Sequence, residues 1–440
     1  MTLLVISPDY ASHLYPLATL ATSWRDAGER VVVATGPATD GIVRGFGYER
    51  AELRLGRGSN PGVIRAEHQP RGEDESLRGF FDATRQGAVE TLAFQARARR
   101  DDLLWDPVGT ARDVVRVLDA VQPDDVIVDH LAFSARIALS ANGIRHADVV
   151  LGHPSALVVG EEVYGYPPAL PGCIRPRADA LAELRRLCED VRDDFTAQWN
   201  VALSRLAPGA PPSRDAFAET GDVLLLNYPA ELHPEARTAA LPPHAFLGSA
   251  VRSEPSDGEV AEWLAAASDD DRPLVYVSLG SFLSVRSDVL ARVAEGLRGL
   301  DVRVALASGS TRRQDLGPVP DSWLVREVLP QVTLLGRASL AVTHGGNNSV
   351  TEALTSGVPL LVLPLSTDQF AGAAAIEDAG FGEALDPNAA TPQELRDAVV
   401  RLLTLPGATR QRLVRLRDSL VLEPGAVRAR AAVQAPLVGG

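Results

Sequence analysis

Short apolar runs alternate with helical patterns along both halves of the chain, and this alternation limits the possible folds more than any other feature. In the first half the clearest runs are residues 3–6, 31–34, 126–128 and 224–226. In the second half they are residues 274–278, 304–307, 340–343 and 360–363. Short buried runs separated by helical segments are typical of βα units around parallel sheets. The sequence therefore predicts an α/β protein in which each half supplies its own sheet.

The chain is long enough to require more than one hydrophobic core. With 440 residues, two domains with a cleft between them are expected. Residues 234–257 are rich in proline and polar side chains and are predicted to link a first domain, 1–233, to a second, 258–407. The remaining stretch, 408–440, is predicted to form a helix that returns to the first domain, followed by a loose tail after Pro424.

Charge and residue usage exclude several classes of function. A formal net charge of −14 disfavours nucleic-acid binding, because phosphates repel such a surface. The sequence contains no lysine, so all 43 basic residues are arginines. Chemistry that needs a lysine is therefore unavailable, which removes pyridoxal Schiff bases, Walker A loops and the ion pair of protein kinases.

Cysteine usage and the apolar segments indicate the compartment. Cys173 and Cys188 are the only cysteines, which excludes a disulfide framework, a zinc ribbon and an iron–sulfur cluster. No run of about 18 apolar residues is present, so no membrane-spanning helix is predicted. The first residues, MTLLVISP, lack the basic region and the cleavage site of a signal peptide. We expect them to form a first β-strand, and we expect the protein to be cytoplasmic.

The stretch 327–382 carries the most informative motif. The strand predicted at 340–343 runs into HGGNNS, whose two glycines form a tight corner before a helix, and a second helix is expected to start at an Asp-Gln pair further on. A strand, a glycine corner and a helix direct free backbone N–H groups and a positive dipole end at one point. This arrangement predicts a phosphate site. The polar side chains around it indicate a larger ligand with hydroxyls, which we interpret as a nucleotide sugar.

The combination of HGGNNS, a glutamate three residues later and the Asp-Gln pair resembles family 1 glycosyltransferases of the GT-B fold. The resemblance is strong over residues 273–385 and moderate over the first strand–helix unit and the strand at 126–128. It implies two Rossmann-like domains that face each other across a cleft. It also implies an inverting transfer of a glucose-like hexose from a UDP- or dTDP-sugar to a hydroxyl of a small, largely apolar natural product. No metal or other cofactor and no stable membrane insertion are expected, and the enzyme would be a monomer or a homodimer.

The diphosphate of the donor is expected to lie on the glycine corner. The histidine at the strand end can donate from its ring to a phosphate oxygen, the glycines allow the backbone to approach closely, and the polar side chains at the helix start add donors. A serine in VSLGS, after another buried strand, is a further donor. The residues assigned to the diphosphate are Ser281, His344, Gly345, Gly346, Asn348 and Ser349.

The resemblance also assigns the nucleoside and the sugar. It implies that Glu352 accepts hydrogen bonds from ribose hydroxyls, that Asp368 and Gln369 read hydroxyls of the transferred sugar, and that Gln331 lies at the base edge. Val328 takes the place of a tryptophan that stacks on uracil in many relatives, and the turn before the HGGNNS strand is roughly two residues shorter than in plant enzymes. The choice between uracil and thymine therefore stays open.

The general base is expected in the first domain. Histidine suits this role because its ordinary pKa lies near neutrality. His13 lies in a loop before Pro16, which is predicted to open the first helix, and in the family a histidine in a GHxxP-like loop is the base; here Ser12 replaces the glycine. Asp129 ends the predicted strand DVIVD. Since the ends of adjacent parallel strands share one edge of a sheet, Asp129 can meet His13 and fix its tautomer.

Residues 73–105 predict long helical segments with an apolar face. The face either packs on the first sheet or lines a pocket for a hydrophobic acceptor, and both can hold. Contacts to the acceptor are assigned to aromatic residues of this apolar face and to histidines at strand ends and in loops of the first domain. These residues are Phe80, Phe81, Trp105, His130 and His153.

Other functions fit the sequence less well. A nucleotide-sugar hydrolase or epimerase of the same fold would not need the long apolar segment or the His13 and Asp129 pair. A non-catalytic partner that only binds nucleotide sugars would be expected to lack His13, Glu352 or Asp368, and all three are present. A dinucleotide dehydrogenase is disfavoured because SPDYASH, with no GxGxxG, follows the first strand.

Overall fold

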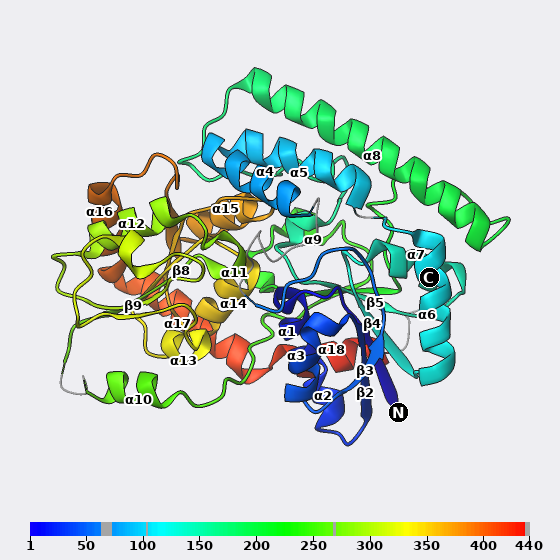
Figure 1. The fold of residues 1–440 in the computed structure, drawn as a ribbon, viewed down its shortest axis with the longest axis horizontal. Helices are drawn as coiled ribbons and strands as arrows, with labels where there is room; N and C mark the ends of the chain where they lie inside the picture. The colour runs from blue at the N-terminus through cyan, green and yellow to red at the C-terminus, as the bar shows by residue number, and fades with distance from the viewer. Residues whose placement is uncertain (63–72, 103, 267–269, 436–440) are drawn as a thin grey trace.

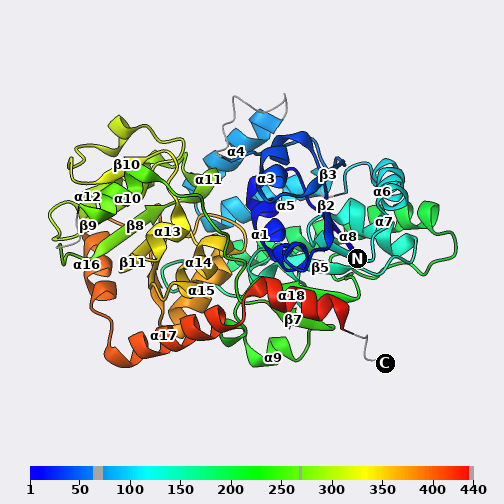
Figure 2. The ribbon, with the colours of Figure 1, turned by 90° about the horizontal axis from the view of Figure 1, so that it is seen from below.

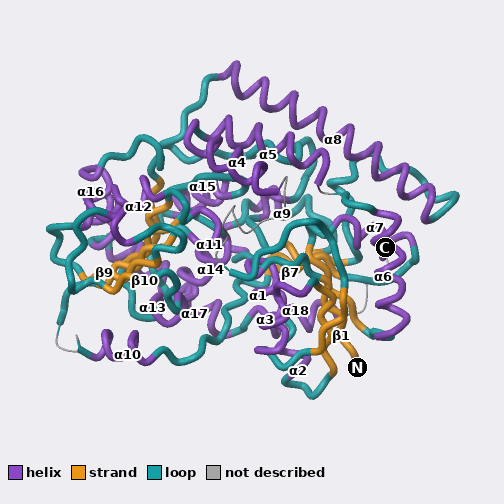
Figure 3. Tube along the Cα trace, in the orientation of Figure 1, coloured by secondary structure: helices purple, strands orange, loops and turns teal. Residues whose placement is uncertain are grey.

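Two parallel sheets, one in each half of the chain, form the framework of the molecule. The computed structural model describes residues 1–62, 73–102, 104–266 and 270–435, and the two sheets lie apart within it (Figure 3). The first sheet has the order β3-β2-β1-β4-β5-β6-β7 and the second β10-β9-β8-β11-β12-β13. The predicted α/β architecture with one sheet per half is confirmed.

The strands follow the apolar runs closely. Those of the first sheet are β1 (Thr2–Ile6), β2 (Arg30–Thr35), β3 (Glu49–Glu52), β4 (Asp125–Asp129), β5 (Ala147–Val150), β6 (Val223–Leu226) and β7 (His244–Phe246). Those of the second are β8 (Leu274–Ser278), β9 (Arg303–Ala307), β10 (Leu324–Arg326), β11 (Leu340–Thr343), β12 (Leu360–Val362) and β13 (Gly382–Ala384).

Helices cover both faces of each sheet (Figure 1). In the first half they are α1 (Ala11–Leu20), α2 (Thr22–Arg25), α3 (Asp40–Gly45), α4 (Glu73–Gln86), α5 (Ala88–Asp102), α6 (Pro107–Val121), α7 (Phe133–Ala141), α8 (Ala178–Leu206) and α9 (Glu235–Thr238). In the second half they are α10 (Gly258–Ala265), α11 (Gly280–Leu283), α12 (Ser287–Leu297), α13 (Gln331–Leu335), α14 (Asn347–Thr355), α15 (Gln369–Ala379), α16 (Pro392–Leu403), α17 (Gly407–Leu422) and α18 (Gly425–Gln434).

Burial explains why the strands read as continuous apolar runs. Leu3, Leu4, Val5 and Ile6 of β1 are all fully buried, because successive side chains enter the cores on opposite faces of the sheet. A parallel sheet covered by helices on both faces needs apolar residues at every position rather than at alternate ones.

The predicted boundary of the first domain is wrong at its carboxyl end. β7 pairs with β6 through Leu224 and His244, so the first sheet continues to Phe246. Pro242 and Pro243, which lie within the predicted linker 234–257, lead directly into this edge strand, and the Pro243 carbonyl accepts from the Leu224 N–H at 2.8 Å. The connection between the domains is therefore the shorter stretch 247–257.

The end of the chain returns to the first domain, as expected. α17 packs on α14 of the second domain, and α18 crosses to lie against α1 and α2 (Figure 2). Ala429 and Val433 of α18 are buried in the core of the first domain. The expected loose tail after Pro424 is therefore wrong as far as α18 extends, and residues 436–440 lie outside the described part of the chain.

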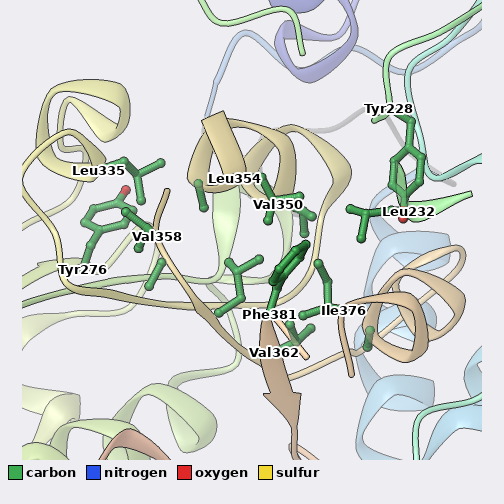
Figure 4. Packing of buried hydrophobic residues seen from close by; sticks show 14 of the residues in the cluster. Tyr228, Leu232, Tyr276, Leu335, Val350, Leu354, Val358, Val362, Ile376 and Phe381 are labelled. Atoms are coloured by element: carbon green, nitrogen blue, oxygen red, sulfur yellow. The ribbon is translucent and has the colours of Figure 1, made fainter. Parts of the chain in front are cut away.

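The two domains share apolar contacts. One cluster of buried side chains joins residues of the first domain, such as Tyr228 and Leu232, to Val350, Ile376 and Phe381 of the second. Figure 4 shows these side chains together around α14 and α15. This packing positions the carboxyl ends of the two sheets opposite each other.

A layer of helices lies over the contact between the two domains (Figure 1). The helices expected within residues 73–105 are present as α4 and α5, with Leu103 outside the described residues. Beside them runs α8, a helix of 29 residues (Figure 1). The sequence analysis did not identify this helix, because its charged and apolar residues alternate without a diagnostic motif.

Candidate active site

The site lies where the carboxyl ends of the two sheets meet, and hydrogen bonds cross this boundary. Asn347, the first residue of α14, donates from its side-chain amide to the carbonyl oxygens of Leu151 and Asn227, each at 2.8 Å. The neighbouring amide of Asn348 donates to the carbonyl oxygen of Ser12 at 3.0 Å. The start of α14 is therefore attached directly to three strand ends and loops of the first domain.

His13 and Asp129 come together at the carboxyl ends of the adjacent strands β1 and β4. His13 Nδ1 lies 2.6 Å from Asp129 Oδ2, and the other carboxylate oxygen accepts from the Leu131 N–H at 2.8 Å. The side chain of Asp129 is 2% exposed and that of His13 is 29% exposed. With Nδ1 held by the carboxylate, the lone pair of a neutral His13 ring is on Nε2, where an incoming hydroxyl proton can be accepted.

The surroundings of His13 favour its protonated form. Burial alone would lower the pKa of His13, but the charge and hydrogen bond of Asp129, with a smaller contribution from Asp368, raise it above its ordinary value. An imidazole that gains stability on accepting a proton is suited to act as a base in a transfer step.

The first helix begins earlier than the sequence predicted. α1 starts at Ala11, so His13 lies in its first turn rather than in a preceding loop, and Pro16 lies inside the helix. Proline has no N–H to donate to the carbonyl four residues earlier, which belongs to Ser12. That carbonyl is the acceptor for Asn348, so the proline leaves open a group that the second domain uses.

The glycine corner has the geometry expected of an anion site. Gly345 has φ +84°, a conformation that side chains other than glycine rarely adopt. Gly346 is the N-cap of α14 and offers no capping side chain, and the first helical hydrogen bond runs from Val350 N to Gly346 O. The backbone N–H groups of the first turn therefore precede any partner within the helix and point out of its positive end.

His344 lies between this corner and the start of α11. A Cβ atom on Gly280 would lie 2.7 Å from Cε1 of the His344 ring, and one on Gly346 would also collide with the ring. These two glycines therefore hold the imidazole between them, with Ser281 following at the start of α11. Burial lowers the pKa of His344 to about 4, so the ring is neutral at pH 7 and carries one N–H.

Glu352, one turn further along α14, is buried with two partners. One oxygen accepts from Arg252 Nη1 at 2.7 Å and the other from Gln331 Nε2 at 2.5 Å. Gln331 also approaches Ser349, with its Nε2 3.3 Å from the hydroxyl oxygen. Val328, a short distance before Gln331, is 60% exposed. The sequence analysis missed Arg252, because it lies in the domain connection and belongs to no motif.

Asp368 contacts the first domain directly. One of its oxygens accepts from the His153 backbone N–H at 2.5 Å, and the other accepts from the Thr367 hydroxyl at 2.8 Å. Thr367 has φ +49°, which is unusual for a β-branched residue. Its N–H donates to the side chain of Gln95 on α5 at 3.2 Å. Gln95 had no sequence signal that linked it to this loop.

Gln369 supports the loop that carries Asp368. Its side-chain oxygen accepts from the N–H groups of Leu365 at 3.0 Å and Ser366 at 3.1 Å, and its amide donates to the Ser366 hydroxyl at 3.0 Å. Gln369 is 7% exposed. The structure therefore places this side chain inside the loop, with the Asp368 carboxylate beside it at the domain boundary.

The phenylalanines assigned to the acceptor lie between the domains. Phe80 and Phe81 are 7% and 6% exposed, and their ring centroids lie 5.4 and 5.7 Å from that of Phe282 on α11. Trp105 is half-buried, and its carbonyl accepts from the Ser134 hydroxyl at 2.9 Å. In this arrangement the two phenylalanines attach α4 to the second domain.

Of the two histidines assigned to the acceptor, His130 is buried and His153 is half-buried. His130 is 2% exposed, with Nδ1 3.1 Å from Asp148 Oδ2, and burial and the charge of Arg136 lower its pKa. Burial lowers the pKa of His153 to about 3, and its ring lies edge-on to Tyr228 with centroids 4.8 Å apart. Both rings are therefore neutral at pH 7.

The described part of the chain contains neither a metal-binding group nor a membrane-spanning helix. Within residues 1–62, 73–102, 104–266 and 270–435, no group of three or more histidine, cysteine, aspartate or glutamate side chains could hold a metal ion. In the same ranges no helix has the length and apolar character needed to cross a membrane.

The sequence is similar to those of known transferases. Residues 199–413 match the family described as "UDP-glucoronosyl and UDP-glucosyl transferase". The 10-deoxymethynolide desosaminyltransferase of Streptomyces venezuelae is 27% identical over 426 residues, which cover 92% of this chain and 90% of that protein. The NDP-glycosyltransferase YjiC of Bacillus licheniformis is 33% identical over 133 residues, 30% of this chain and 34% of that protein. The alignment with YjiC thus spans about a third of that relative.

Solved structures resemble the whole chain. The glycosyltransferase of kitacinnamycin has a TM-score of 0.66 at 22% identity and covers 98% of this chain and 97% of its own. The glycosyltransferase VinC, in complex with dTDP, has a TM-score of 0.65 at 20% identity over 99% of this chain and 100% of its own. At these identities the likeness is one of fold, and it spans both sheets.

Proposed function

We propose that this chain is an inverting family 1 glycosyltransferase, on the basis of the family match over residues 199–413 and of the GT-B fold. It moves a glucose-like hexose from a nucleoside diphosphate sugar to a hydroxyl of a small, largely apolar natural product, with inversion at the anomeric carbon. The observation that carries the proposal is the 2.6 Å pair of His13 and Asp129, which lies beside the open start of α14. A base and an anion cradle are the two parts that such a transfer needs.

His13 removes the proton of the acceptor. As the acceptor oxygen attacks the anomeric carbon, its proton passes to His13 Nε2, and the bond from that carbon to the diphosphate oxygen breaks with its electron pair remaining on the diphosphate. Asp129 stabilises the imidazolium that forms, because its carboxylate holds Nδ1 at 2.6 Å. General base catalysis of this kind contributes roughly 10²–10⁴ in rate.

The start of α14 binds the departing diphosphate. A helix N-terminus stabilises a nearby anion by about 0.3–1 kcal/mol, and by up to about 2 kcal/mol when partly buried. Because the diphosphate gains negative charge as it leaves, these N–H groups and the His344 ring act more strongly in the transition state than in the ground state. In this scheme Asn348, Ser349 and Ser281 add side-chain donors, and a chelator is expected to leave turnover unchanged.

The nucleoside and the sugar lie on either side of the diphosphate. Glu352 and Gln331 face the ribose and the base edge, and Asp368 reads hydroxyls of the sugar while Gln369 holds its loop. VinC was solved with dTDP and the spinosyn rhamnosyltransferase SpnG with thymidine diphosphate. The exposed Val328 provides no aromatic ring for either base, so UDP and dTDP both remain candidates.

Relatives support a natural-product acceptor. They include the demethyllactenocin mycarosyltransferase of Streptomyces fradiae, 34% identical over 137 residues, 31% of this chain and 30% of that protein. SpnG has also been solved with spinosyn aglycone. The half-buried Trp105 remains a proposed apolar contact of the acceptor, whereas Phe80 and Phe81 are buried against Phe282 and support the site from behind. Cytoplasmic location stays a prediction.

One experiment tests the proposal directly. The purified protein is incubated with UDP- or dTDP-glucose and a panel of hydroxylated aromatic and macrolide acceptors, and both the nucleoside diphosphate and the glycosylated product are quantified by mass spectrometry. The proposal expects the two products in equal amounts, and only when an acceptor is present. Nucleoside diphosphate released at the same rate without acceptor would instead identify a nucleotide-sugar hydrolase.

A further inference from the structure

We infer that Arg252, in the connection between the two domains, is a positioning residue for the donor nucleotide: it holds Glu352 as an oriented carboxylate that can accept hydrogen bonds from the ribose. The inference rests on the proposed function, because it concerns how that same donor site is made competent. Nothing in the motifs of the second domain identifies this arginine.

The contacts of Arg252 are specific. Its Nη1 donates to Glu352 Oε1 at 2.7 Å, and its Nη2 donates to Glu254 Oε1 at 2.9 Å. The side chains of Glu352 and Glu254 are 3% and 7% exposed, whereas that of Arg252 is 23% exposed. One guanidinium therefore holds two buried carboxylates. Removing one partner of a buried ion pair is strongly destabilising, because it leaves the other charge buried without a counter-charge.

The two carboxylates are fixed on their other sides as well. Gln331 donates to the second oxygen of Glu352 at 2.5 Å. The second oxygen of Glu254 accepts from the N–H of Thr333 at 3.0 Å and from its hydroxyl at 3.2 Å. Both partners belong to α13, the helix at the base edge of the proposed nucleoside site. Arg252 thus joins α13, α14 and the domain connection at one point.

The charges around Glu352 explain why this arginine is needed. The groups that face it are Arg252 and Glu254 from the connection, Tyr276 from β8 and the uncharged Gln331 from α13. Burial raises the pKa of Glu352, and the charge of Arg252 opposes that shift, while Glu254 adds to it. Without Arg252, the buried carboxylate would face only neutral groups and another carboxylate, so it would take up a proton more readily.

Protonation would change what Glu352 can do. An ionised carboxylate only accepts hydrogen bonds, which matches the hydroxyls of a ribose, whereas a protonated one donates through one oxygen and loses acceptor strength. The guanidinium of Arg252 also lies over the ring of Tyr15, with its Cζ atom 5.4 Å from the ring centroid. Tyr15 follows His13 by two residues on α1. The same side chain therefore links the nucleoside site to the helix that carries the base.

The test compares nucleotide binding across pH. Affinities for UDP and dTDP are measured by calorimetry between pH 5.5 and 8.5 for the wild-type protein, Arg252→Gln, Arg252→Lys and the double variant Arg252→Gln/Glu352→Gln. Arg337→Gln is the matched control, because it removes the same charge from an exposed position just after α13. The terminal phosphate of the ligand itself titrates near pH 6, so the quantity followed is the ratio of variant to wild-type affinity at each pH.

Arg252→Gln is expected to weaken binding about 10- to 100-fold, with the deficit growing as the pH falls and Glu352 becomes protonated. Arg252→Lys keeps the charge and should show a smaller deficit that does not grow, and the double variant should lose the extra pH dependence. If the affinity of Arg252→Gln relative to the wild type stays near one, or equals the relative affinity of Arg337→Gln at every pH, the inference is overturned. Failure of the wild-type protein to bind either nucleotide would overturn the proposed function itself.

Discussion

The side-chain amide of Asn348 donates a 3.0 Å hydrogen bond to the carbonyl oxygen of Ser12, the residue before His13. This bond joins α14, the proposed diphosphate cradle, to α1, which carries the proposed base His13. It exists because Pro16 has no N–H with which to occupy the same carbonyl. The position of His13 therefore depends in part on a contact with the start of α14.

Removing this connection should slow the reaction moderately. For Asn348→Ala we expect a two- to tenfold lower kcat/KM for the acceptor, because a single hydrogen bond contributes about 0.5–1.5 kcal/mol. Steady-state kinetics at saturating donor checks this, and the affinity for free nucleoside diphosphate is measured beside it, because Asn348 is also a proposed donor to the diphosphate. Equal rates for Asn348→Ala and the wild type would show that the bond has no part in alignment.

Removing the base should have a much larger effect. His13→Ala is expected to lower kcat by roughly 10²–10⁴, the usual contribution of a general base. Nucleoside diphosphate affinity should stay within a factor of about two of the wild type, because the proposed diphosphate site lies on α14 and not on α1. His244→Ala, on the distant edge strand β7, is the control variant. A full rate in His13→Ala would end the assignment of His13 as the base.

The pH profile reports on the partner of the base. His13 must be neutral to accept a proton, so kcat should rise as the pH passes upward through its pKa, which Asp129 holds above the ordinary value against the effect of burial. In Asp129→Asn that pKa falls, and the acidic limb of the profile should move to lower pH while the maximal rate decreases. Rates measured between pH 5 and 9 check both effects. An acidic limb in Asp129→Asn at the wild-type position would mean that another group titrates there.

Asp368 should affect the sugar more than the nucleotide. Its carboxylate lies at the domain boundary, held by the His153 N–H. For Asp368→Asn we expect KM for the nucleotide sugar to rise about tenfold or more, since charge-assisted hydrogen bonds to sugar hydroxyls contribute about 1.5–3 kcal/mol. Binding of the free nucleoside diphosphate should change little. Calorimetry measures the affinity for the nucleotide sugar and for the free nucleoside diphosphate. If Asp368→Asn lowers both affinities equally, the sugar-reading role is contradicted.

Local patterns in the sequence were sufficient to predict much of the local structure around the candidate site. The strand at β11, the glycine corner and the helix from Asn347 follow from residues adjacent in the chain. The meeting of His13 and Asp129 was predictable because β1 and β4 are neighbours in one sheet and both residues follow or end those strands. Conformational preference and strand-end geometry are local rules, and a single sequence contains them.

Contacts between the domains were not predictable in the same way. The position of Phe80 against Phe282, the pairing of β7 with β6 and the contact of Arg252 with Glu352 depend on packing between segments far apart in the chain. Even the start of α1 was misjudged, since a proline in the middle of a helix is tolerated here where another domain uses the free carbonyl.

A crystal structure of the protein soaked with UDP or dTDP tests the central claim most directly. The account predicts that the terminal phosphate lies within hydrogen-bonding distance of the His344 ring and of the backbone N–H groups at the start of α14. It also predicts that the ribose hydroxyls lie on Glu352. A nucleotide bound with its phosphates away from α14, in protein that is active under the same conditions, would contradict it.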